Sequence, residues 1–83
     1  MKSKADLEAQ VFEVFTELFG DDHIVQIHGD PLRREGVSSH EYVSHIIVDG
    51  HVIARAIAKD WRQSYRLLKF QVEKLYIDGH ALV

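Results

Sequence analysis

The spacing of apolar residues predicts a helix near each end of the chain. Over residues 3–19, apolar side chains recur every three or four positions, which places them on one face of a helix. Ser3 or Asp6 can cap the start of this helix, and Gly20 can take the left-handed conformation that ends it. The apolar stripe comprises Leu7, Val11, Val14, Phe15 and Leu18, widened by Phe12 and Phe19.

The second helix is predicted from about residue 60 to residue 76, with Asp60 as its N-cap. Its strongest apolar stripe steps by four, three, four and three residues, so it occupies one face. Basic residues lie roughly 100° around the helix from that stripe. The stripe contains Trp61, Tyr65, Leu68, Val72 and Leu75, and the basic face contains Lys59, Arg62, Arg66 and Lys69.

Three segments rich in β-branched residues predict strands between the helices, over residues 24–27, 42–48 and 52–58. After the first strand, Gly29, Asp30 and Pro31 are expected to break the chain and start a loop over residues 29–39. Asp49 and Gly50 predict a two-residue hairpin turn, because both turn positions need a positive φ.

The hairpin register decides which side chains share a face of the sheet. A two-residue turn would set Val48 opposite His51 and Ile46 opposite Ile53. Neither face is then clearly polar, so we expect the second face to be covered, and a second copy of the chain is one candidate. The first face would carry Tyr42, Ser44, Ile46, Val48, Ile53 and Ile57, and the second Val43, His45, Ile47, Val52, Ala54 and Ala56.

The element order predicts an α+β fold, αβββα, in which a three-stranded antiparallel sheet carries both helices on one face. The 83 residues are predicted to form a single domain, residues 1–83. The chain has no cysteine, which excludes a disulfide scaffold and a zinc–thiolate site. Packing alone, or packing together with self-association, must therefore hold so small a fold.

The net charge of −3 is mildly acidic, whereas a strongly electrostatic nucleic-acid binder is usually basic. The charge is unevenly divided, because residues 2–22 carry a net −4 and residues 59–74 a net +3. Either the two helices attract each other or are simply solvated, or the basic helix binds an anionic partner. With no signal-peptide pattern and no apolar run of about 20 residues, we expect no membrane association and an intracellular location, cytoplasmic or nuclear.

Residues 42–75 carry more specific features. Tyr42 stands eight positions before Gly50, small residues alternate along the third predicted strand at Ala54, Ala56 and Ala58, and a basic segment over residues 59–64 begins the last helix. This arrangement resembles the double-stranded RNA-binding domain, a family with the same αβββα order. The first helix and first strand resemble the family in element order only.

The resemblance implies recognition of duplex RNA, mostly by shape and by backbone contacts. In the family, the start of the second helix lies over phosphates across the major groove, and the first helix and the loop after the first strand touch the minor groove. By position, the helix contacts here would come from Lys59, Arg62, Arg66 and Lys69, and the loop contacts from Arg33, Arg34 and His40.

The start of the second helix also departs from the family. Trp61 and Tyr65 stand where the family has further lysines, and Asp60 adds a negative charge. Every phosphate that stays without a cationic partner means about one counterion fewer released on binding, which weakens the complex. An exposed Trp–Tyr pair is typical of a protein interface, and the same two residues could equally enlarge the core. In the family register the core side would instead hold Ser64, Leu67, Leu68, Gln71 and Leu75.

No pattern predicts catalysis or metal binding. The six histidines are scattered, with no i, i+4 pair on a helix, and no nucleophile motif or phosphate-binding glycine loop is present. We therefore expect a non-enzymatic protein without cofactor or metal. The histidines are His23, His28, His40, His45, His51 and His80.

Two functions remain open. The first is duplex RNA binding through the basic second helix. The second is a domain of the same fold used for protein–protein association or homodimerisation, with Trp61 and Tyr65 at the interface and little or no RNA binding.

Overall fold

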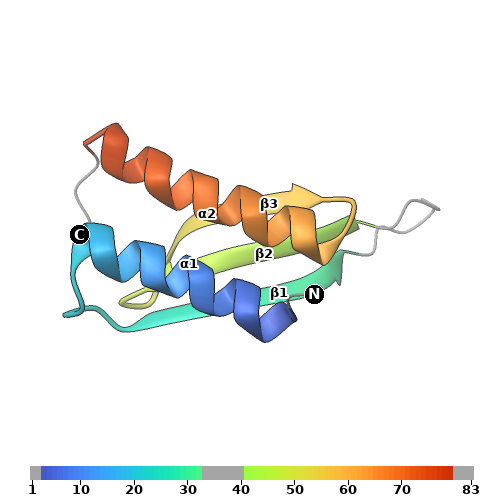
Figure 1. Cartoon of the computed structure of the whole chain (residues 1–83), viewed down its shortest axis with the longest axis horizontal. Helices are drawn as coiled ribbons and strands as arrows, with labels where there is room; N and C mark the ends of the chain where they lie inside the picture. Colours follow the sequence, from blue (N-terminus) through green and yellow to red (C-terminus); the bar gives the residue numbers. More distant parts are fainter. Residues whose placement is uncertain (1–2, 33–40, 80–83) are drawn as a thin grey trace.

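The computed structural model describes residues 3–32 and 41–79. The strands form one antiparallel sheet in the order β1-β2-β3, and both helices lie on the same face of it (Figure 1). This confirms the predicted αβββα fold. The elements are α1 (Lys4–Phe19), β1 (Val25–Leu32), β2 (Glu41–Val48), β3 (His51–Ala58) and α2 (Trp61–Ile77).

Side-chain caps define the starts of both helices, with Asp60 capping α2 as predicted and Ser3, one of the two predicted candidates, capping α1. The Ser3 hydroxyl accepts from the backbone N–H of Asp6 at 3.2 Å, and the Asp6 carboxylate accepts from the N–H of Ser3 at 3.0 Å. Asp60 accepts from the N–H of Gln63 at 2.8 Å and caps α2. Gly20 ends α1 with a φ of 93° and a ψ of 173°, a conformation that favours glycine but is not the left-handed helical one that we predicted.

The predicted break after the first strand is wrong. Gly29, Asp30 and Pro31 all pair with β2, and β1 continues to Leu32. Proline is tolerated at position 31 because β1 is an edge strand. Its outer side pairs with no other strand, so the missing N–H removes no inter-strand hydrogen bond there. The chain from 33 to 40, which holds most of the predicted loop, lies outside the described residues.

The hairpin turn is as predicted, with φ of 52° at Asp49 and 87° at Gly50. Val48 pairs with His51, but a register irregularity between Ile46 and Ile47 sets Ile46 opposite Ala54 rather than opposite Ile53.

This irregularity shifts the rest of β3 by one residue, so the predicted faces of Ala54, Ala56 and Ile57 are wrong. The predicted faces of Val52 and Ile53, which precede the shift, are confirmed. Ala54 and Ala56 belong to the core side, while Ile57 is 41% exposed.

The hydrophobic core fills the space between the sheet and the two helices. Ala56 presents only a methyl group to α2, and the Ser64 hydroxyl lies 2.9 Å from the Ala56 carbonyl oxygen and 2.7 Å from the Ser44 hydroxyl. The Ser44 hydroxyl in turn donates to the Ser64 carbonyl at 3.0 Å, which holds α2 close to the sheet. The core comprises Val11, Phe15, Tyr42, Ile46, Val48, Ala56, Tyr65, Leu68 and Val72.

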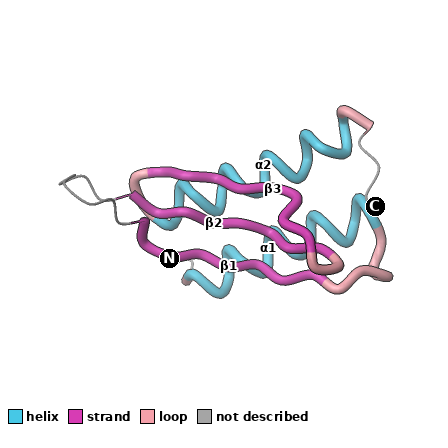
Figure 2. The backbone as a smooth tube through the Cα atoms, turned by 180° about the vertical axis from the view of Figure 1, so that it is seen from behind, coloured by secondary structure: helices cyan, strands magenta, loops and turns pink. Residues whose placement is uncertain are grey.

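Figure 2 shows the opposite face of the sheet from behind, with both helices on the far side. No other part of the described chain covers this open sheet face. Strand pairing places three rows of residues across it. The rows are Gln26, Ile47 and Val52; His28, His45 and Arg55; and Asp30, Val43 and Ile57.

Candidate nucleic-acid interface

The orientation of α2 determines which of its residues reach solvent. Tyr65 is only 1% exposed and Trp61 is partly buried against the core, whereas Leu67 is 44% exposed and Gln71 is also exposed. The helix therefore packs on the stripe that contains Trp61 and Tyr65, rotated from the family register. Tyr65 belongs to the core, and its interpretation as an exposed interface residue does not hold.

Tyr65 links α2 to α1 beneath the surface. Its hydroxyl donates to a carboxylate oxygen of Glu8 at 2.9 Å. Burial, and then the bonds and charge of its neighbours, raise the pKa of Tyr65 far above the usual value for tyrosine, so the hydroxyl stays protonated as a donor. The Lys4 ammonium donates to the Gly29 carbonyl at 3.1 Å, so the first turns of α1 are tied both to α2 and to β1.

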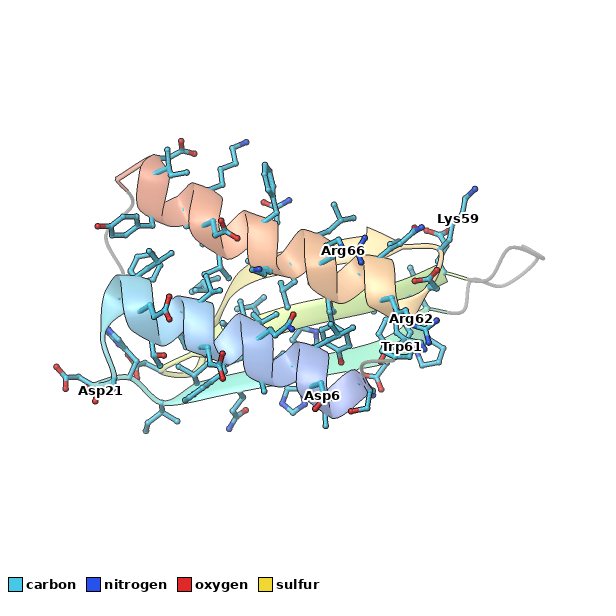
Figure 3. The ribbon with its side chains drawn as sticks, in the orientation of Figure 1. Asp6, Asp21, Lys59, Trp61, Arg62 and Arg66 are labelled. Carbon is cyan, nitrogen blue, oxygen red and sulfur yellow. The ribbon has the colours of Figure 1, made fainter. Side chains whose placement is uncertain are left out.

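The basic residues at the start of α2 reach solvent to different extents. Lys59, just before the helix, and Arg62 and Arg66 are exposed (Figure 3). Lys69 is partly exposed. The Arg62 guanidinium lies 4.7 Å from the centroid of the Trp61 ring, a cation–π contact that limits the positions available to Arg62. No ion pair within the described residues joins Lys59, Arg66 or Lys69 to a carboxylate.

The two helices run in the same direction, so both begin at one end of the molecule (Figure 1). Helix N-termini carry partial positive charge, which adds to the charge of the basic residues at that end. Asp21 lies at the opposite end, beyond α1 (Figure 3). Part of the acidity of the first element is therefore remote from the start of α2.

The end of β3 lies beside the start of β2, since Ala58 pairs with Tyr42. Lys59 therefore follows directly from the end of the sheet at which β1 finishes and β2 begins. Arg33, Arg34 and His40, the predicted loop contacts, lie outside the described residues.

A pocket of about 260 Å³ lies between the two helices. Two side chains of the pocket lining, Arg66 and Lys69, are cationic. The remaining lining consists of two apolar side chains and the Gln10 amide from α1, together with Tyr65 from α2. Sequence reasoning missed this pocket, because it depends on how far apart the helices pack. It is lined by Leu7, Gln10, Val11, Tyr65, Arg66 and Lys69.

A histidine–carboxylate contact stabilises the end of the sheet where the β2–β3 hairpin turns. His23 Nδ1 lies 2.7 Å from a carboxylate oxygen of Asp49, and the same carboxylate accepts from the N–H of Ile24 at 2.9 Å. These two hydrogen bonds lower the pKa of Asp49. They connect the segment before β1 to the hairpin turn, so the pair is structural.

A multi-ligand metal site and a membrane-spanning helix each have a characteristic geometry. No cluster of three or more histidine and acidic side chains with the geometry of a metal site occurs within residues 3–32 and 41–79. None of the described helices is both long and apolar enough to cross a membrane. Comparison with known proteins adds no relative, because no family model, curated protein or solved structure matches the chain.

Proposed function

We propose that this domain is a non-catalytic module that binds duplex RNA through the start of α2. The carrying observation is the orientation of that helix, in which Tyr65 is buried and Trp61 packs against the core while Arg62 and Arg66 remain exposed. The two aromatic residues thus do not displace the cations from the outer face. The resemblance over residues 42–75 supports the same function.

The expected interaction is electrostatic and limited in strength. Residues 59–69 span about 15 Å along the chain at the helical rise, and they carry four cationic side chains. If all four side chains neutralise phosphates, a plot of the logarithm of the association constant against the logarithm of the salt concentration should have a slope of about −3 to −4. Tight binders neutralise more phosphates, so we expect modest affinity that disappears at high salt.

The proposal is tested by titrating a labelled RNA duplex of about 16 base pairs at several salt concentrations. Arg66→Ala should weaken binding and reduce the salt slope by about 1, because the variant neutralises one phosphate fewer. Lys74→Ala is the matched control, since it removes one positive charge from the last turn of the same helix. Equal effects of the two variants, or no binding at low salt, would overturn the proposal.

A second candidate function, homodimerisation, is favoured by the open sheet face. Val52 is 53% exposed and Ile57 41% exposed, and both stand on this face beside partly exposed residues of β2. Each row beside the central row of His45 holds two apolar residues and one polar residue at its β1 end. A two-fold axis along the central row would place the apolar part of each row against that of the other row in the second copy.

Sedimentation velocity distinguishes this candidate from RNA binding. If the open face mediates a dimer, Ile57→Asp should give a monomer and leave the affinity for the RNA duplex unchanged. A wild-type protein that stays monomeric at high concentration would exclude homodimerisation through this face.

A further inference from the structure

We propose that His28 and His45 form a chelating site for a divalent transition metal ion, best matched by Zn²⁺, on the open sheet face. The two residues are direct partners across the β1–β2 pairing. Their ring centroids are 5.6 Å apart, and the ring planes are inclined by 40°. His28 is exposed and His45 partly exposed, so an ion from solvent can reach both rings.

The ring separation fits tetrahedral coordination. A zinc–nitrogen bond of about 2.0–2.1 Å places each imidazole centroid about 3.2 Å from the ion. Two such rings at a tetrahedral angle then have centroids about 5.3 Å apart, close to the observed value, whereas a right angle would bring them to about 4.5 Å. The observed separation therefore matches tetrahedral Zn²⁺ better than square-planar Cu²⁺.

The sheet holds the pair ready for an ion. Strand pairing fixes the two Cα positions, so only the side-chain torsions need to be ordered on binding. Imidazole nitrogen suits Zn²⁺, whereas Mg²⁺ and Ca²⁺ prefer oxygen ligands. With two protein ligands, the remaining positions fall to water, so binding should be weaker and more exchangeable than in a four-ligand structural site.

Arg55 supplies an internal check on this site. It pairs with His45 from the other side, on β3, and is the third member of the same row. Its positive charge opposes a bound cation, and the repulsion is moderate because the side chain is exposed. Removing the charge should therefore strengthen zinc binding, an effect that a general loss of structure would not produce.

The test is calorimetric titration of the whole chain with zinc chloride near neutral pH, with an ¹⁵N-correlation spectrum to locate the site. We expect one site per chain, with shifts centred on residues 28 and 45 and none with magnesium chloride. His28→Ala and His45→Ala should each reduce affinity by at least about ten-fold, since loss of even an outer-shell partner costs that much. Arg55→Ala should increase affinity several-fold.

His51→Ala is the matched control, because it removes an exposed histidine at the start of β3. Its affinity for zinc should equal that of the wild type. Zinc binding that survives in the double variant His28→Ala/His45→Ala, or no binding by the wild-type chain, would overturn the inference. The site lies on the face of the sheet opposite the helices, so the outcome is independent of RNA binding.

Discussion

At Gly29 the backbone lies directly against buried side chains, and this close fit supports a quantitative prediction. Gly29 is buried in β1, and a Cβ added there would overlap the Tyr65 hydroxyl and lie 2.7 Å from both Cε1 and Oη of Tyr42. Real Cβ atoms do not approach heavy atoms this closely, so Gly29→Ala must displace two buried aromatic side chains.

The direction of the change in stability distinguishes this steric clash from the usual effect of replacing a flexible glycine by alanine. Gly29 is not among the positive-φ residues, so alanine meets no backbone strain and, with space available, would stabilise the fold by about 0.4–1 kcal/mol. Overpacking a core typically costs about 1–3 kcal/mol. Displacing Tyr65 also weakens its bond to Glu8, and hydrogen bonds to charged groups contribute about 1.5–3 kcal/mol.

We therefore expect Gly29→Ala to lower the free energy of unfolding by about 2–4 kcal/mol, a large part of the 5–15 kcal/mol of a typical domain. Urea unfolding followed by circular dichroism measures the change. The control is Gln26→Ala, an exposed substitution in the same strand, which should change stability by no more than about 0.5 kcal/mol.

A double-mutant cycle tests the cause. Tyr65→Phe removes the hydroxyl that meets the new methyl group, so Gly29→Ala should cost at least about 1 kcal/mol less in the Tyr65→Phe background. Additive effects of the two substitutions would refute the steric argument. A neutral or stabilising Gly29→Ala would refute the placement of the two tyrosines.

Three further predictions concern the polar contacts. Ser64→Ala should lower the free energy of unfolding by about 1–3 kcal/mol in urea unfolding, because it leaves a buried hydroxyl and carbonyl short of a partner; an unchanged midpoint would contradict this. Asp60→Ala should cost about 1 kcal/mol in the same assay through removal of the α2 cap, and Asp60→Asn should restore most of it. Because the pKa of Asp49 is lowered in the folded state, its ionised carboxylate stabilises the fold at pH values above the ordinary aspartate pKa of about 3.9. This stabilisation disappears as the pH falls through the lower pKa of the folded state. Asp49→Asn keeps a residue suited to the turn, so it should unfold at a lower temperature than the wild type at neutral pH and at the same temperature in acid. A difference in unfolding temperature that does not change with pH would show that the charge of Asp49 is not the cause.

Local signals predicted most of the fold. Ser3, Asp60 and the Asp49–Gly50 turn act through hydrogen bonds and φ angles within a few residues. The sequence alone therefore identified the α2 cap and the hairpin, and it narrowed the cap of α1 to Ser3 or Asp6. Gly29 and Pro31 were misinterpreted for the same reason. Their local preference is for a turn, but pairing with β2 and an edge position in the sheet outweighed it.

The candidate RNA interface was predicted only in part. The sequence identified Arg62 and Arg66 as members of one helix face, but it left open whether Trp61 and Tyr65 lie outside or inside. That choice depends on the rotation of α2 about its axis. The observed rotation allows the bond from Tyr65 to Glu8 and the close approach of Ser64 to β3, and both join residues distant in the chain or in different elements.

The amino-acid sequence by itself thus determined the order of elements, the helix caps, the turn and the uneven distribution of charge, because each depends on neighbours along the chain. Tertiary structure alone decided the β3 register after Ile46, the extent of β1, the burial of Tyr65 and the pairing of His28 with His45. Those features arise where separate elements compete for the same buried volume and the same backbone hydrogen bonds, and no local preference specifies the result.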